Sequence, residues 1–348
     1  MSYDHQQNRR HKRYLSYASR TLVPARYRKH YELMGEISIE PEAAAQVKMP
    51  DDLKKLAVKI GTDGPHKTLA TQRLIQLLFN GVYMMKTTSA IFVWEHPYYP
   101  QLYIPAAELQ DYFDARSADL QITPGEEIKS EDDPDQLLAT QWTISVREKS
   151  IAKVIRFADE LPKPAISLQG LVKIDFASID QWFEESTPIF VHPKDPFKRV
   201  DILQSTRHIV VKIDGRVVAD TDSSMHLYET SLPCRYYLPL TRVDASILRP
   251  STTKTQCPYK GEAEYYDVEI DGTVYEDIVW YYNRPLLESA RIEGLVCFYN
   301  EKVQIEVDGE ELEVPVTPFT GKKPGDGKDV VVDMGSVGTP LATVKEES

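Results

Sequence analysis

The stretch HIVVKIDGRVVAD, residues 208–220, contains an Asp-Gly pair between two short runs of apolar residues. This pattern is typical of two antiparallel strands joined by a two-residue turn, because both turn positions need a positive φ that Asp and Gly tolerate. Four such signals in the chain predict a core made mainly of β-strands. The other three are Asn80-Gly81 in LIQLLFNGVYMM, Asp271-Gly272 in YYDVEIDGTVYED and Asp308-Gly309 in VQIEVDGEELEV.

Helical periodicity is weaker than the strand signal. Only two segments have the spacing of a short amphipathic helix, Asp51–Ile60 and Pro105–Phe113. The chain has 348 residues and 42% hydrophobic residues, which is enough for two domains with a core each. The predicted fold class is mainly β, a β-rich α+β chain with a few short helices.

Two of the hairpin signals belong to an internal repeat. Placing Arg73–Pro105 under Arg207–Pro239 needs no gap and keeps a constant offset of 134 residues, and the register resumes further on at an offset of 124. The first copy therefore has ten extra residues between the matched blocks, which we expect near the acidic stretch PGEEIKSEDDPDQ (124–136), a predicted surface loop. The identities are Arg73/Arg207, Ile75/Ile209, Gly81/Gly215, Thr87/Thr221, Ser89/Ser223, Glu95/Glu229, Tyr103/Tyr237 and Pro105/Pro239, then Gly170/Gly294.

The repeat and the charge pattern together predict four segments: an N-terminal basic, partly disordered arm (1–65), a first, degenerate repeat domain (70–190), a second repeat domain (195–313) and a flexible C-terminal tail (316–348). The net charge is −12, but residues 1–34 hold eight basic and two acidic residues. The arm is either a docking or nuclear-targeting tail with an acidic partner, or a solvated leader.

Composition also limits the cellular compartment and the classes of binding partner that we expect for this chain. An acidic chain is a poor general binder of nucleic acid, and no apolar run approaches the roughly 20 residues of a membrane helix. The basic N-terminus lacks the apolar core of a secretory signal. The three cysteines have no CxxC spacing and the histidines form no metal-binding pair. We therefore expect a cytoplasmic protein with no membrane or nucleic-acid partner, no cofactor and no metal site.

Polar residues that could carry chemistry concentrate in two segments of the second copy, HLYETSLPCRYYLP (226–239) and STTKTQCPYKGEAEYY (251–266). Together these offer Glu229, Tyr237, Cys257, Lys260 and Tyr265. A carboxylate, a thiol and an ammonium in one pocket shift one another's pKa values and can act as acid, nucleophile or anion binder.

Each of these residues also has a structural interpretation. Glu229 could form a salt bridge, Cys257 could be a packed thiol, and Trp280 and Tyr282 in DIVWYYNRP could be core residues instead of the wall of a ring-stacking pocket.

The second copy resembles the family named domain of unknown function 427, for which a nucleotidyltransferase label is also used. The resemblance is carried by KRVDILQSTRHIVVKIDGRVVADT, LYETSLPCRYYLP, TKTQCPYKGEAEYY, VWYYNRP and IEGLVCFY, with Cys-Pro-Tyr-Lys-Gly (257–261) the most specific element. It implies a compact tent-like β domain, here in tandem as in fungal-type members. The pocket candidates it implies are Asp220, Glu229, Tyr237, Cys257, Lys260, Tyr265, Trp280 and Tyr282.

The first copy departs from this pattern. It resembles the family through FNGVYMMKTTSAIFVWEHPYYPQLYIP, but it lacks Cys-Pro-x-Lys-Gly and, at an offset of 124, has Arg156 where the second copy has Trp280. We expect the first copy to have lost the pocket or to use it differently. The nucleotidyltransferase reading needs paired acids after Gly-Ser, and Asp220-x-Asp222 has no Gly-Ser before it.

Two function classes remain. In the leading hypothesis the second repeat binds, and could transform, a small anionic or aromatic metabolite: Glu229, Cys257 and Lys260 are catalytic, and the other five candidates bind ligand. In the rival class the same residues are a hydrogen-bond network in a non-catalytic scaffold or interaction module. A nucleotidyltransferase-like enzyme is a third alternative.

Overall fold

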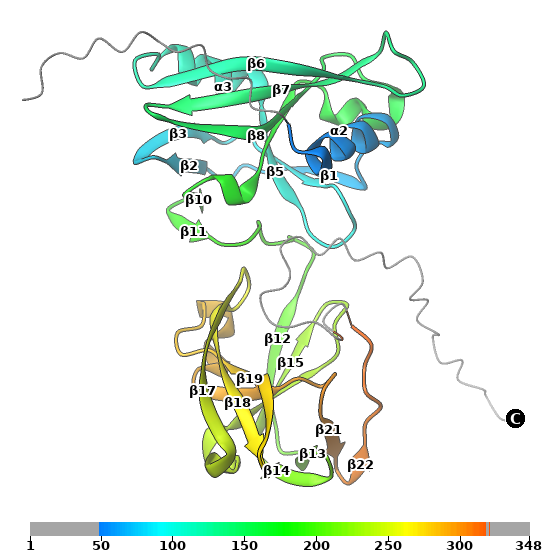
Figure 1. Ribbon diagram of the computed structural model, residues 1–348, viewed down its shortest axis with the longest axis vertical. Coiled ribbons are helices and arrows are strands. Elements are labelled where there is room, and N and C mark those ends of the chain that lie inside the picture. Colours follow the sequence, from blue (N-terminus) through cyan, green and yellow to red (C-terminus); the bar gives the residue numbers. More distant parts are fainter. Residues whose placement is uncertain (1–48, 318–319, 321–348) are drawn as a thin grey trace, which may run out of the picture. The chain divides into compact units, whose positions relative to one another are not determined.

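The computed structural model describes residues 49–317 and residue 320. The first repeat begins with a helix and contains eleven strands among the described residues (Figure 1). Its elements are α2 (Asp51–Asp63), β1 (Lys67–Ala70), β2 (Ile75–Phe79), β3 (Val82–Thr87), β4 (Ile91–Trp94), β5 (Gln101–Pro105), α3 (Ala106–Asp114), β6 (Leu120–Lys129), β7 (Leu137–Val146), β8 (Lys149–Phe157), η2 (Lys163–Leu168), β9 (Leu171–Ile174), η3 (Phe176–Ser178), β10 (Gln181–Glu184) and β11 (Thr187–Ile189).

The second repeat also has eleven strands in the described chain, but two short 3-10 turns take the place of α3, and no helix corresponding to α2 precedes its first strand among the described residues. Its elements are β12 (Val200–Ser205), β13 (Ile209–Ile213), β14 (Arg216–Thr221), β15 (Ser224–Glu229), β16 (Arg235–Pro239), η4 (Leu240–Arg242), η5 (Ala245–Ile247), β17 (Leu248–Cys257), β18 (Gly261–Ile270), β19 (Thr273–Tyr281), η6 (Leu287–Ile292), β20 (Leu295–Phe298), β21 (Gln304–Val307) and β22 (Glu310–Glu311).

Strand order confirms the predicted tandem duplication. In the first repeat the seven-stranded sheet has the order β1-β4-β5-β9-β8-β7-β6 and the four-stranded sheet β11-β10-β2-β3. The second repeat has β12-β15-β16-β20-β19-β18-β17 and β14-β13-β21-β22, which are the same two orders carried by equivalent strands. The β-rich fold class is likewise confirmed.

All four predicted hairpin turns are present. They connect β2 to β3, β13 to β14, β18 to β19 and β21 to β22, and every Asn, Asp and Gly in them has positive φ. At Asp214-Gly215, for example, the two φ angles are 49° and 79°, as a turn with two left-handed residues requires.

Both predicted helices are also present. Helix α2 has Asp51 and Asp52 in its first turn, where negative charge favours the positive end of the helix dipole, and it ends before Gly64 with φ 78°. Its Leu53, Ala57 and Ile60 face inward at helical spacing. Residues 51–63, which the sequence assigns to the arm, therefore pack on the first repeat.

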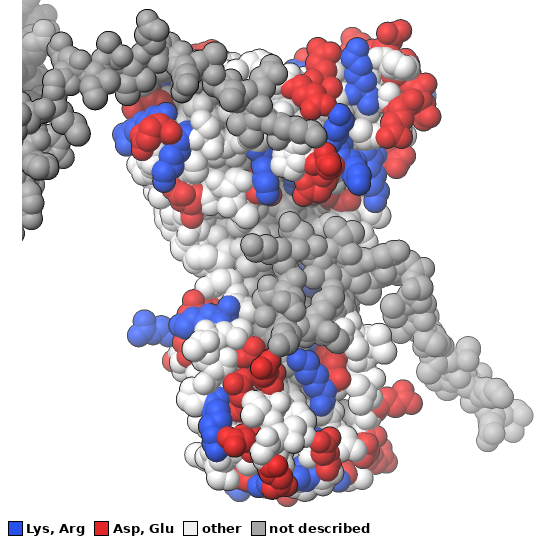
Figure 2. Space-filling model, in the orientation of Figure 1, with Lys and Arg blue, Asp and Glu red and all other residues white. Residues whose placement is uncertain are grey.

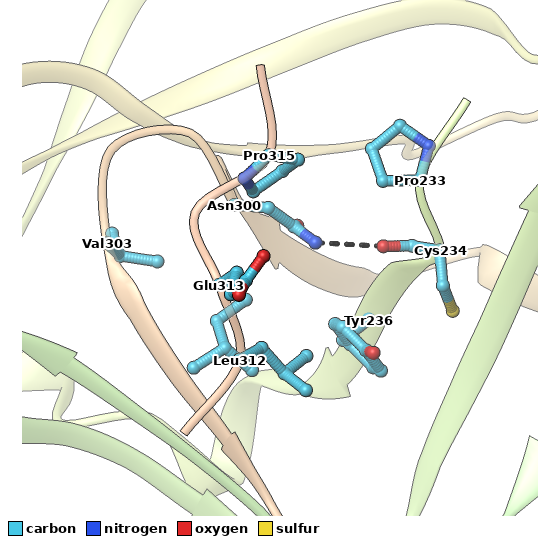
Figure 3. A pocket seen from close by; sticks show the side chains of 9 residues that line it. Pro233, Cys234, Tyr236, Asn300, Val303, Leu312, Glu313 and Pro315 are labelled. Atoms are coloured by element: carbon cyan, nitrogen blue, oxygen red, sulfur yellow. Dashed lines mark hydrogen bonds between the residues drawn. The ribbon is translucent and has the colours of Figure 1, made fainter. Parts of the chain in front are cut away.

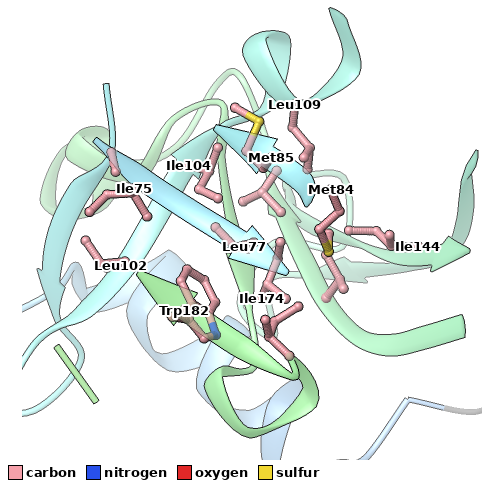
Figure 4. Close-up of a cluster of buried hydrophobic side chains, with 14 of the residues drawn as sticks. Ile75, Leu77, Met84, Met85, Leu102, Ile104, Leu109, Ile144, Ile174 and Trp182 are labelled. Atoms are coloured by element: carbon pink, nitrogen blue, oxygen red, sulfur yellow. The ribbon is translucent and has the colours of Figure 1, made fainter. Parts of the chain in front are cut away.

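The core of each repeat lies between its two sheets. In the first repeat, apolar side chains from both sheets and from α3 interdigitate (Figure 4). The labelled members are Ile75, Leu77, Met84, Met85, Leu102, Ile104, Leu109, Ile144, Ile174 and Trp182.

Strand register corrects one part of the repeat alignment. In the first repeat, Lys173 lies between Tyr103 on one neighbouring strand and Ile155 on the other. In the second repeat, Cys297 lies in the same way between Tyr237, the equivalent of Tyr103, and Trp280. Trp280 therefore corresponds to Ile155, not to Arg156.

The cause of this slip is one extra residue in β19. Asp277 stands there with φ 51°, and its carboxylate accepts hydrogen bonds from the Ser251 and Thr253 hydroxyls at 2.6 and 2.9 Å. A one-residue shift moves every side chain to the opposite face of a strand, so ungapped alignment exchanges the two faces here.

The extra residues of the first copy are also placed differently from the expectation. Ile122 and Leu248 occupy equivalent register positions, so Pro105–Ile122 has eight more residues than Pro239–Leu248. Helix α3 takes up most of them. Strand β6 includes residues 124–129 of the acidic stretch, and only residues 130–136 form the turn between strands.

The basic segment 1–34 and nearly all of the predicted tail lie outside the described residues, so the arm and its acidic partner remain predictions. In the described part of the chain, no helix has the length and apolar character to cross a membrane. On the face in Figure 2, acidic and basic side chains are intermixed over the described surface.

Candidate functional site

The candidate residues of the second repeat gather on one face of its seven-stranded sheet. Successive strand residues point to opposite faces, so Val279 and Tyr281 face the four-stranded sheet while Trp280 faces away. We call the face directed away from the four-stranded sheet the aromatic face. Its buried members are Ile202, Leu227, Tyr237, Ala263, Tyr265, Trp280, Tyr282, Ile292 and Cys297.

Buried hydroxyl groups on the aromatic face form hydrogen bonds with neighbouring side chains. Trp280 Nε1 donates a hydrogen bond to Tyr237 Oη at 2.9 Å, and the two rings are perpendicular. The Tyr265 and Thr255 hydroxyls are 2.7 Å apart. Burial raises the pKa of Tyr237 and of Tyr265, so both stay protonated at neutral pH.

Glu229, at the end of β15, lies between two ammonium groups. Its carboxylate is 2.5 Å from Lys260 Nζ and 2.9 Å from Lys198 Nζ, and only 7% of its side chain is exposed. Burial alone would raise the pKa of Glu229, but the two ammonium groups outweigh burial and lower it. Glu229 is therefore a carboxylate at neutral pH.

Lys260 keeps its charge despite its surroundings. Burial favours the neutral amine, but electrostatic interactions with Cys257 and Glu229 and the hydrogen bond to Glu229 raise the pKa of Lys260 above its ordinary value. Its side chain is 12% exposed. Lys260 is thus a fixed buried cation that can stabilise an anionic group.

The turn Cys257–Gly261 is fixed by backbone contacts. Leu286 N donates to the Lys260 carbonyl at 3.0 Å, and the Ser289 hydroxyl donates to the Tyr259 carbonyl at 3.2 Å. Gly261 has φ 100°, and a Cβ there would meet the Arg284 carbonyl oxygen at 3.4 Å. These constraints explain the glycine that ends Cys-Pro-Tyr-Lys-Gly.

Seven of the eight predicted residues come together on or beside the aromatic face. Burial raises the pKa of Tyr282 most, and Tyr237, Cys257 and Glu229 add to the shift, so Tyr282 lies within electrostatic reach of all three. The structure places Asp220 apart: it is exposed on β14 of the four-stranded sheet, 2.8 Å from His208 Nε2. The seven that gather are Glu229, Tyr237, Cys257, Lys260, Tyr265, Trp280 and Tyr282.

Sequence reasoning missed three charged residues at this site. Lys198 precedes β12 and follows the first repeat, and its only signal was its place at the start of the family-like segment KRVD. Arg235 makes two hydrogen bonds, at 2.7 and 2.6 Å, to the fully buried carboxylate of Glu301, and its guanidinium lies over the Trp280 ring. Nothing local marks Arg235 and Glu301, 66 residues apart, as partners.

Two pockets lie away from the gathered residues. One, of about 100 Å³, has Cys234, Tyr236, Asn300, Leu312 and Glu313 among its lining residues (Figure 3). The other is a charged groove of about 410 Å³ along α2 and residues 130–132. Neither of these two pockets includes Glu229, Cys257 or Lys260.

The equivalent face of the first repeat is covered by a helix. Leu53, Ala57 and Ile60 of α2 pack there against Tyr103 and Phe157. Behind them Glu95, the counterpart of Glu229, pairs with Lys173 and accepts a hydrogen bond from the Tyr103 hydroxyl at 2.9 Å. Lys173 occupies the register position of Cys297.

Comparison with family models matches the chain twice. The model described as a domain of unknown function (DUF427) matches residues 67–185 and 201–309. No match to the chain is found among curated proteins. Both matched regions coincide with the two repeats, so the likeness extends to the copy that lacks Cys-Pro-x-Lys-Gly.

Proposed function

The chain belongs to the DUF427 family, with two copies of its domain, and from that premise we propose that the second copy binds a small molecule with an anionic group and a planar ring. The observation that supports this most is the charge balance around Glu229. Lys198 and Lys260 share one buried carboxylate, which leaves one positive charge in excess. Buried charges need partners, and an anionic ligand would supply the missing one.

The surroundings of these lysines fit the rest of such a ligand. Tyr282 and Trp280 offer ring surfaces beside the charged groups. The ligand would enter by displacing Lys198, because the side chain of Lys198 is 22% exposed and lies outside the sheet. The first repeat, with one lysine for Glu95, has no excess charge at the equivalent place and would not bind.

A thermal-shift series on the full chain tests this proposal. The probes are benzoate, phenyl phosphate and adenosine monophosphate, with neutral benzamide as the matched control. A probe at 100-fold excess over its Kd stabilises the folded protein by about 2.7 kcal/mol. We expect an anionic probe to raise Tm, and both Lys198→Met and Lys260→Met to abolish the rise.

Lys254→Met is the control variant, because Lys254 is an exposed lysine of the same sheet that pairs with Glu262 and Glu264. It should keep the shift. If no anionic probe stabilises the wild type more than benzamide does, the proposal is wrong.

The scaffold alternative is supported by a different observation, the polar contacts that the clustered residues make with one another. Glu229, Lys260, Tyr237 and Trp280 satisfy one another's polar groups and line neither pocket. In a scaffold, Glu229→Gln would lower stability while no probe had any effect. The same thermal-shift series therefore separates the two functions.

A further inference from the structure

The second repeat has a small pocket on the side of its seven-stranded sheet opposite to the aromatic face. Tyr236 of β16 and Ile305 of β21 line it, so it lies where the seven-stranded and four-stranded sheets meet (Figure 3). Tyr236 points there because the next residue, Tyr237, points to the aromatic face. The pocket volume is about 100 Å³. An apolar cavity of about 150 Å³ holds benzene, so this pocket takes a molecule of roughly four or five non-hydrogen atoms.

Asn300 brings an unpaired acceptor to this pocket. Only 6% of the residue is exposed, and its Nδ2 donates a hydrogen bond to the Cys234 carbonyl at 2.9 Å, the dashed line in Figure 3. That bond fixes the orientation of the amide, because the reverse orientation would place two acceptor oxygens against each other. Oδ1 is buried too, and no donor among the described residues reaches it. A buried acceptor without a donor costs free energy, so a ligand that donates a hydrogen bond here would stabilise the folded protein.

The lining of the pocket carries a single charge. Glu313 follows β22 and is exposed, which places its carboxylate at the opening to solvent. It is the one charged side chain of the nine described residues that line the pocket. Burial raises the pKa of Cys234 to about 11 and that of Tyr236 to about 12, so both stay neutral. A carboxylate and an amide oxygen both accept hydrogen bonds, so the pocket favours a ligand that donates them and carries a positive charge.

The first repeat fills the equivalent space with aromatic rings. Counted from the ends of β9 and β20, Phe176 stands where Asn300 does, and strand register places Trp182 at the position of Ile305. The Phe176 and Trp182 rings are stacked, with 5.3 Å between centroids and 7° between planes, and Trp182 is 1% exposed. The second repeat therefore has the same frame with smaller side chains, which leave the pocket open to a ligand.

We propose that this pocket binds a primary ammonium group on a short alkyl chain. The ammonium donates a hydrogen bond to Asn300 Oδ1 and faces the carboxylate of Glu313. The alkyl chain, of roughly three or four carbons, lies along the apolar wall formed by Ile305 and Leu312. Two sources carry this chemistry, a free short-chain amine and the end of a lysine side chain, and the test separates them.

The test measures Kd values by saturation-transfer NMR on the full chain. The probe is propylammonium, with propan-1-ol as the neutral control of the same size and propionate as the anionic control. We expect propylammonium to bind about tenfold or more tightly than propan-1-ol, because its hydrogen bonds are charge-assisted, and propionate not to bind. Nα-acetyl-lysinamide is the second probe. Tighter binding than propylammonium identifies a lysine side chain as the source, and weaker binding identifies a free amine.

Variants locate the bound probe. Asn300→Phe/Ile305→Trp gives the second repeat the rings of the first and should abolish binding of propylammonium. Glu313→Gln should weaken binding about twofold to fivefold, because a charge pair with an exposed carboxylate contributes little. Glu310→Gln is the matched control: Glu310 is an exposed carboxylate of β22 that does not line the pocket, so the Kd should stay unchanged. Urea denaturation checks that each variant folds.

Three results would overturn the inference. The first is propylammonium binding no tighter than propan-1-ol, and the second is binding that survives in the folded double variant. The third is no binding of either amine, which would mean that the pocket holds water only. If the double variant does not fold, equal effects of Glu313→Gln and Glu310→Gln would place the binding elsewhere. The anion site at Lys198 and Lys260 takes ligands of the opposite charge, so either proposal can fail while the other stands.

Discussion

The two repeats share a scaffold and differ on one face. Each repeat has a glutamate at or just after the end of one strand and a fully buried tyrosine on the strand that follows in the chain. These residues are Glu95 and Tyr103 in the first repeat, and Glu229 and Tyr237 in the second. In the first repeat one lysine, Lys173, neutralises the glutamate from within the sheet. In the second, two lysines reach it from a turn and from the segment before β12.

The covering of that face differs as well. Helix α2 places Leu53 and Ile60 over the first repeat's face, where Ile155 and Phe157 replace Trp280 and Tyr282. A sheet face can thus be made apolar and closed in one copy and polar and aromatic in the other, because side chains on one face change without altering strand pairing. This difference between the two faces is the reason that we propose binding for the second repeat and not for the first.

The largest expected effect comes from breaking the Glu95–Lys173 pair. Lys173→Met leaves Glu95, with a side chain 10% exposed, as a buried charge without its cation. We expect a loss of about 3–5 kcal/mol in the free energy of unfolding, measured by urea denaturation.

The double variant Glu95→Gln/Lys173→Met removes both charges and should recover much of that loss. A single variant within 1 kcal/mol of wild type would mean that the pair is not the closed, neutral counterpart of the second site.

Removing a side chain from the α2 cover should have the next largest effect. Leu53→Ala leaves a cavity between α2 and the sheet, and we expect it to cost about 2–4 kcal/mol. Lys55→Ala, on the exposed side of α2, should change stability by less than about 0.5 kcal/mol.

Both α2 variants should keep any probe-induced shift of the second repeat. If Leu53→Ala abolished that shift, the two faces would not be independent.

A pH effect is expected from His192, which follows the first repeat and stacks on Tyr99 at 4.0 Å between ring centroids. Burial lowers the pKa of His192 to about 4, against about 6.5 when unfolded. Between these values the unfolded chain binds more protons, so stability is full above pH 6.5 and falls as the pH drops toward 4, by about 3 kcal/mol.

His192→Gln should remove this part of the pH dependence, as seen by urea denaturation from pH 4.5 to 7.5. The stability of the variant relative to wild type would then rise as the pH falls. Parallel curves for the two proteins would show that His192 does not titrate in this range.

The smallest effect should be the same in both repeats. Gly81→Ala and Gly215→Ala place a side chain at φ 72° and 79°, with no atom within 4 Å of the new Cβ. Only backbone strain remains, and each variant should lose about 1 kcal/mol of unfolding free energy. A marked difference between them would show that the shared hairpin does not contribute equally to the two repeats.

Local patterns in the sequence predicted the parts of the fold that local geometry controls. The Asn-Gly and Asp-Gly turns were right because positive φ is a property of those residues in any context. The helix over residues 51–60 was right because Leu53, Ala57 and Ile60 repeat at helical spacing. The register around Trp280 was wrong, because the extra residue Asp277 in β19 has no signal in an ungapped comparison.

For the site, the sequence by itself determined the residue types: it marked Glu229, Tyr237, Cys257 and Lys260 through their motif segments. Only the tertiary structure decided their relations. Lys198 forms an ion pair with Glu229, which lies 31 residues further along the chain. Asp220 lies apart from the other site candidates because β14 belongs to the four-stranded sheet. Strand order and register, which depend on contacts between distant segments, set which side chains share a face. Local propensity cannot supply that information, so the charge balance at Glu229 is visible only in the folded chain.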